Sequence, residues 1–131
     1  MTIRSLHLLF GAGGVLVFLG TGGYMATHFP TAYEHNEAVR YMYRANHVYV
    51  LLASLINVAI GIYCRGSRPG WRGIVARTGS ALALAAPLVL LYAFFAEPPH
   101  GVPERPVTLI GIAMLLAGVL AQWPNRAREQ Q

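Results

Sequence analysis

Residues 78–96 read TGSALALAAPLVLLYAFFA, a run without a single charged side chain. A helix needs about 17 to 25 predominantly apolar residues to cross a bilayer. Three further uncharged runs, at residues 8–26, 48–64 and 106–123, are also long enough. Backbone groups in lipid have to pair within their own segment, so these runs predict helices. We therefore expect an all-α integral membrane protein, a four-transmembrane-helix up-down bundle that forms a single domain over residues 1–131.

The overall composition agrees with this expectation. The chain has 131 residues, of which 55% are hydrophobic and 11% are charged. Its mean hydropathy is +0.45. Soluble domains carry about 25% charged residues, and a soluble domain this small cannot hide so much apolar surface. A disordered chain would need low hydrophobicity and a high net charge. The composition therefore argues against both classes and favours the lipid bilayer as the surroundings of the chain.

The arginines indicate how the helices are oriented. All ten basic residues are arginine, and they fall unequally on the two sides of the expected bundle. By the positive-inside rule, the richer side is cytoplasmic. Both termini are then cytoplasmic, and residues 27–47 and 97–105 form the outer loops. The cytoplasmic side holds Arg4, Arg65, Arg68, Arg72, Arg77, Arg126 and Arg128, and the outer side holds Arg40, Arg44 and Arg105. Four acidic residues join the outer side, namely Glu34, Glu37, Glu97 and Glu104.

The same distribution bears on partners and location. The arginines form no patch with interleaved aromatic residues, so we expect no nucleic-acid partner. A basic complement made only of arginine, in an alanine-rich chain, is typical of a GC-rich genome. We therefore expect the bacterial inner (cytoplasmic) membrane. The single cysteine, Cys64, excludes an intrachain disulfide and any CxxC motif.

Three local patterns predict details of the helices. The sequence of residues 31–34, TAYE, fits a capping box, so the second helix should start near Ala32. The proline-rich segment 97–103 should be a stiff, non-helical loop. Ala113, Ala117 and Ala121 form a stripe of small residues with Gly111 and Gly118 beside it, which predicts close helix packing within the bundle or in an oligomer. No acidic residue lies within any of the four runs, so we expect no buried ionisable group there.

A polar stripe follows one face of the second helix. Its members recur every three or four residues, with Asn57 at the margin: Arg40, Arg44, His47, Leu51, Ser54, Val58 and Gly61. One interpretation is an outward-open polar cleft formed by Arg40, Arg44, His47, Ser54 and Asn57, with His47 near its floor. The alternative is that Ser54 and Asn57 only form hydrogen bonds between helices, which is common in membrane bundles.

Most histidines fall on the expected outer side. His28, His35, His47 and His100 lie there, with Met25 and Met42 near the same level. Imidazole and thioether groups are ligands that suit copper or zinc. The spacing matches no metal motif, since neither HxxxH nor HExxH occurs. We therefore consider a metal site formed by His28, His35, His47, His100 and Met42 beside a second interpretation, in which these are polar residues in a wet loop.

The first helix suggests a haem alternative. Residues 6–25, LHLLFGAGGVLVFLGTGGYM, resemble the first helices of small membrane b-type haem proteins. The resemblance implies haem b with His7 as an axial ligand, and with Gly11 and Gly14 letting the porphyrin approach the backbone. The chain offers no second histidine at the depth of His7. A haem there would need a second subunit or a ligand other than histidine.

Two hypotheses about function follow. The first is a small non-enzymatic membrane protein, either an auxiliary subunit of a larger membrane complex or a homo-oligomer, with a polar, histidine-rich outer face. The second is a metal- or haem-b-binding membrane protein that uses the outer histidines. A proton-coupled exporter would need a carboxylate within a span, and none is present. Nucleophilic catalysis lacks a base next to any serine, threonine or cysteine in the sequence, so we expect no enzyme unless the fold brings a base beside one of them.

Overall fold

A computed structural model describes residues 1–63, 69–100 and 105–122 of the chain. Within these ranges the chain forms only helices: α1 (Ile3–Ala32), α2 (Glu37–Tyr63), α3 (Trp71–Ala96), the short 3-10 helix η1 (Pro98–His100) and α4 (Pro106–Gln122). Several residues used for the topology lie outside the described ranges, namely Cys64, Arg65, Arg68, Glu104, Arg126 and Arg128.

The helices confirm an all-α protein of the membrane type. α1, α2 and α3 are each long and apolar enough to cross a bilayer. The described part of α4 is also apolar but has only 17 residues. Its predicted span includes Trp123, which lies outside the described residues. The fourth span and the cytoplasmic position of the termini therefore stay predictions.

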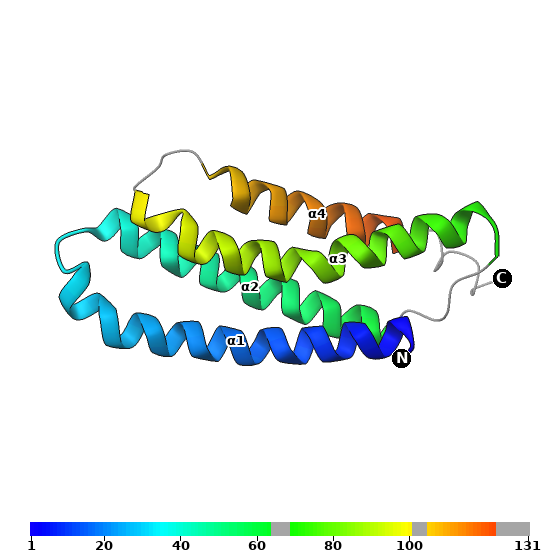
Figure 1. The fold of residues 1–131 in the computed structure, drawn as a ribbon, viewed down its shortest axis with the longest axis horizontal. Coiled ribbons are helices and arrows are strands. Elements are labelled where there is room, and N and C mark those ends of the chain that lie inside the picture. The colour runs from blue at the N-terminus through cyan, green and yellow to red at the C-terminus, as the bar shows by residue number, and fades with distance from the viewer. Residues whose placement is uncertain (64–68, 101–104, 123–131) are drawn as a thin grey trace.

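The helices run alternately up and down as two packed pairs (Figure 1). α1 packs mainly on α2, and α4 packs mainly on α3, while α2 and α3 join the two pairs. Residues 33–36 and η1 lie at the same end of the bundle, which we call the loop end. The N-terminus and the start of α3 lie at the opposite end, which we call the terminal end. This arrangement brings the two predicted outer loops together.

The interior changes in character along the bundle. Its centre is aliphatic and is formed by Val50, Ala53, Ala86, Leu90 and Leu115. Toward the loop end it becomes aromatic, where Tyr43 stacks edge-on against Phe94 at 5.0 Å between ring centroids. Large buried rings contribute much apolar contact in a small space. The interior beneath the polar side chains of the loop end is therefore aromatic, whereas the centre of the bundle is aliphatic.

The small residues of α4 divide between the interior and the surface of the bundle. Ala121 lies against Gly79 of α3, whereas Ala113 and Ala117 are exposed, so packing of these two against another copy stays a prediction. Gly111, beside Leu90, and Gly118, beside Gly79 and Ala83, also make close contacts with α3. Gly79 and Ala83 give α3 a face of small residues, and the glycines of α4 allow its backbone to come close to that face.

The start of α2 also differs from the prediction. α1 continues through Pro30 to Ala32, so Thr31 lies in the last turn of α1 and not at a helix start. Asn36 caps α2 instead, because its Oδ1 accepts a hydrogen bond from the backbone N–H of Val39 at 3.2 Å. Asparagine is among the strongest N-cap residues, so α2 begins after Asn36 and not after Thr31.

The proline-rich segment after α3 is partly helical. Pro98–His100 form one turn of 3-10 helix, where the sequence predicted a non-helical loop. Proline lacks a backbone N–H, but the first residues of a helical turn do not need one. This turn lets the chain reverse direction directly beside the end of α3, which places Glu97 under the start of α4.

Candidate functional site

Arg40 and Arg44 lie at the loop end and line two open clefts. The first, which we call the Glu37 cleft, has a volume of about 270 Å³ and is lined by Glu37, Arg40, Tyr41 and Arg44. The second, which we call the Phe29 cleft, has a volume of about 240 Å³ and is lined by Met25, Ala26, Phe29, Pro30, Arg40 and Arg44. The two arginines therefore form the ridge between a polar cleft and a mainly apolar one.

The rest of the predicted polar stripe packs against α1. The ring of His47 stacks on Phe18 with centroids 3.9 Å apart, and its Nδ1 lies 2.9 Å from the hydroxyl oxygen of Thr21. Ser54 is fully buried, donates to the carbonyl of Val50 in its own helix at 2.6 Å, and lies against Gly14 of α1. The structure thus separates the stripe into two parts. Arg40 and Arg44 line open clefts, whereas His47 and Ser54 contact another helix.

The outer histidines with described side chains lie in different surroundings. His28 is exposed and stacks on Tyr24, and His35 is exposed in the turn before α2. Met42 is buried, and the side chain of His100 lies outside the described part. Among residues 1–63, 69–100 and 105–122, no three His, Cys, Asp or Glu side chains come close enough to hold a metal ion. The copper or zinc site therefore stays a prediction.

His7 is buried between α1 and α2 near the terminal end. Its Nδ1 lies 2.7 Å from Oδ1 of Asn57, which is fully buried. The space beside Gly11 and Gly14, predicted to receive a haem, is occupied by Ser54 and Val58 of α2. The glycines therefore serve contact between the helices in this structure. The haem role of His7, Gly11 and Gly14 stays a prediction.

The hydrogen bonds of Asn57 determine which His7 nitrogen carries the proton. The Nδ2 group of Asn57 donates to the carbonyls of Ala53 at 2.9 Å and Ala83 at 2.7 Å. Its Oδ1 is left to accept from His7, so neutral His7 carries its proton on Nδ1. Nε2 of His7 is then a buried acceptor without a hydrogen-bond partner among the described residues.

We expect nitrogen NMR of histidine-labelled protein to show the Nδ1–H form of neutral His7. Asn57→Leu removes the acceptor while keeping a similar volume, so this preference should disappear. His35, which is exposed in the turn before α2, provides an internal reference in the same spectrum. Neutral His7 with its proton on Nε2 in the unmodified chain would contradict the assignment.

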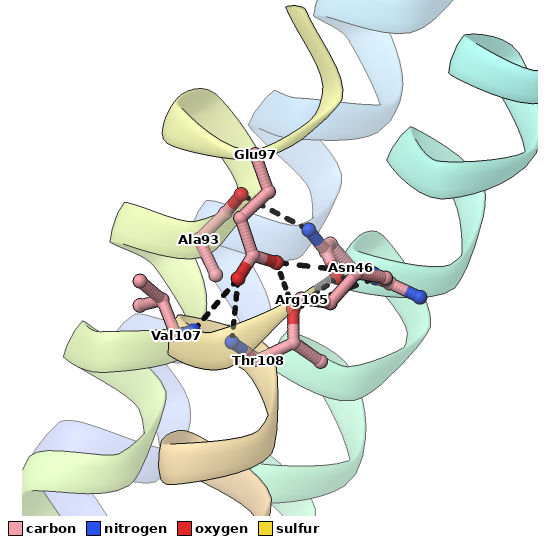
Figure 2. A network of polar contacts seen from close by, with 6 residues as sticks. All are labelled: Asn46, Ala93, Glu97, Arg105, Val107 and Thr108. Carbon is pink, nitrogen blue, oxygen red and sulfur yellow. Dashed lines mark hydrogen bonds and ion pairs between the residues drawn. The ribbon is translucent and has the colours of Figure 1, made fainter. Parts of the chain in front are cut away.

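A buried polar network connects α2, α3 and α4 at the loop end (Figure 2). Glu97 is only 5% exposed. Its Oε1 accepts hydrogen bonds from the backbone N–H groups of Val107 at 2.7 Å and Thr108 at 3.0 Å. These are among the free amides at the start of α4. Glu97 therefore caps α4 from outside that helix, and its negative charge faces the positive end of the helix dipole.

Asn46 and Arg105 complete this network (Figure 2). Asn46 is fully buried, and its Nδ2 donates to the carbonyl of Ala93 at 3.0 Å. Its Oδ1 accepts from the guanidinium of Arg105 and lies 3.0 Å from the hydroxyl oxygen of Thr108. Nε of Arg105 lies 3.8 Å from Oε2 of Glu97. One residue of α2 is thus bonded to the end of α3 and to the start of α4.

The sequence reasoning missed this network. It assigned Glu97 to the proline-rich outer loop and did not single out Asn46. Pro106 was an available signal, because proline is favoured at the first position of a helix. A helix that starts there needs an acceptor for the amides of residues 107 and 108. Glu97, at the end of the preceding helix, is the nearest carboxylate with a described position.

Comparison of the chain with protein-family models, with curated proteins and with solved structures finds no match. Its function therefore has to be argued from its own residues.

Proposed function

We propose that the protein is a small non-enzymatic membrane subunit, which associates with a second copy of itself or with a larger membrane complex through α1. In this proposal α4 is the fourth span, both termini are cytoplasmic, and the membrane is the bacterial inner membrane. The 17 residues of α4 are close to the shortest length that crosses a bilayer. The polar loop end then faces outward.

The observation that carries the proposal is a face of α1 without neighbours. Added Cβ atoms at Gly13, Gly20 and Gly23 would meet nothing within 4 Å. Leu9 and Leu16, on the same face, are 59% and 69% exposed. The glycines that contact α2 already provide the close packing inside the bundle. Small residues on a lipid-facing helix favour close approach of another helix, because they leave a shallow groove for it.

An apolar groove beside this face gives further support. It has a volume of about 320 Å³ and lies between α1 and α3, which contact each other only slightly. Its lining consists of Leu9, Phe10, Gly13, Gly14, Val17, Val50, Pro87, Leu88 and Leu91. A partner helix laid on α1 could place its side chains in this groove, so that ridges pack into grooves as in other helix pairs.

We expect the unmodified chain to self-associate in mild detergent, and the double variant Gly13→Ile and Gly20→Ile to be monomeric. The two branched side chains would fill the shallow face and keep a second helix at a distance. Light scattering coupled to size-exclusion chromatography measures the mass of the protein within the micelle. The variant should keep its helical circular dichroism, because nothing lies within 4 Å of the added Cβ atoms.

Ala81→Ile is the matched control, because Ala81 is an exposed small residue of α3 and does not belong to the face of α1. If the unmodified chain is monomeric, co-purification from membranes tests a larger complex, and the double variant should lose that partner. The proposal is wrong if neither self-association nor a co-purified membrane protein depends on Gly13 and Gly20.

A further inference from the structure

Arg40 and Arg44 are two like charges that form no ion pair in the described part of the chain, although Glu37 lines one cleft with them. They lie four residues apart on α2, so their side chains share a face. Neither side chain forms an ion pair or a hydrogen bond within residues 1–63, 69–100 and 105–122, and Nε of Arg40 is buried without a partner. Like charges at this spacing repel each other, and a buried N–H without an acceptor is unfavourable. An anion between the two side chains would reduce the repulsion between them and accept a hydrogen bond from the unpaired N–H.

The Phe29 cleft suits an anion that is attached to hydrocarbon. Its lining contains both arginines and no acidic residue, whereas the Glu37 cleft includes a carboxylate that would repel an anion. Its remaining walls are Met25, Ala26, Phe29 and Pro30. Apolar walls favour a ligand with apolar surface, because binding removes both surfaces from water. A free hydrated anion gains nothing from them.

The position of the arginines along α2 matches the headgroup layer of a bilayer. The uncharged run of α2 begins at Val48. At 1.5 Å per residue, Arg44 stands about 6 Å and Arg40 about 12 Å beyond the start of that run. The headgroup layer is roughly 5 to 8 Å thick on each side of the hydrocarbon core. Arg44 therefore reaches the level of the lipid phosphates, and Arg40 reaches just above it.

We propose that Arg40 and Arg44 bind the phosphate of a membrane phospholipid in the Phe29 cleft, with its glycerol and first chain carbons against Met25 and Phe29. Guanidinium groups match phosphate oxygens in charge and geometry, and two of them can hold one phosphate from two directions. The site uses the end of α1 and the start of α2. It does not depend on association through Gly13 and Gly20, so the two proposals can fail separately.

Native mass spectrometry of the detergent-solubilised chain tests the proposal, with phosphatidylglycerol and diacylglycerol of identical chains as probes. The unmodified protein should retain one phosphatidylglycerol and no diacylglycerol, because only the former carries a phosphate. The double variant Arg40→Gln and Arg44→Gln should bind phosphatidylglycerol about thirtyfold more weakly, through the loss of two charges beside a phosphate. Circular dichroism should stay unchanged, because neither side chain bonds to another described residue.

Arg72→Gln combined with Arg77→Gln is the matched control, since it removes the same charge from the first two turns of α3, which begins at the terminal end. It should leave the phosphatidylglycerol affinity unchanged. Equal losses in both double variants would show general attraction by net charge and overturn the proposal. Inorganic phosphate that binds as tightly as the lipid and displaces it would also overturn it, because the ligand would then be the free anion.

Discussion

Replacing Glu97 by alanine is expected to lower the free energy of unfolding by about 3 kcal/mol. Removing one partner of a buried ion pair costs about 3 to 5 kcal/mol. We take the low end because Arg105 is 21% exposed and reaches water. The change also removes the acceptor for the amides of Val107 and Thr108, so the start of α4 loses its cap. Unfolding by a denaturing detergent, followed by circular dichroism, measures the difference.

Two variants and a local probe make this prediction specific. Glu34→Ala removes the same charge from an exposed position in the α1–α2 turn and should change stability by less than about 0.5 kcal/mol. Glu97→Gln keeps an acceptor oxygen and should fall between the two. Hydrogen exchange at Val107 and Thr108 should become faster in Glu97→Ala alone. Unchanged exchange there would mean that Glu97 does not cap α4.

Gly11→Ala is expected to destabilise the pairing of α1 with α2 by about 2 kcal/mol, within the usual range for overpacking. A Cβ at Gly11 would lie 2.7 Å from the backbone nitrogen of Val58 and 2.8 Å from the carbonyl oxygen of Ser54. Backbone atoms cannot rotate away as a side chain can, so the helices have to separate. The separation would also stretch the 2.7 Å contact between His7 and Asn57.

Gly13→Ala is the natural comparison, because it makes the same change two residues away. Nothing lies within 4 Å of its added Cβ, and alanine favours a helix over glycine by about 1 kcal/mol. We expect this variant to be as stable as the unmodified chain or slightly more so, when both are measured as dilute monomers in detergent. The opposite order of the two variants would contradict the packing of α1 on α2.

The polar stripe on α2 shows how far helical periodicity reaches. It placed Ser54, Val58 and Gly61 on one face, and in the structure all three meet α1. Periodicity could not distinguish the two ends of the stripe. It shows which side chains share a face of the helix, but it does not show which other helix packs against that face. Where α1 ends, Arg40 and Arg44 face open clefts; one turn lower, His47 stacks on Phe18.

Composition and the uncharged runs by themselves determined that this is a helical protein suited to a membrane. That inference depends only on the length of each run and on the need of backbone groups in lipid to pair locally. It therefore requires no knowledge of which helices contact one another. The tertiary structure alone decided which glycines contact a helix, which acidic residue is buried, and which residues surround the two free arginines. Those features depend on contacts between residues far apart in sequence. Glu97 caps α4, which begins after an intervening turn. Asn46, from α2, forms hydrogen bonds with Ala93 of α3 and with Thr108 of α4.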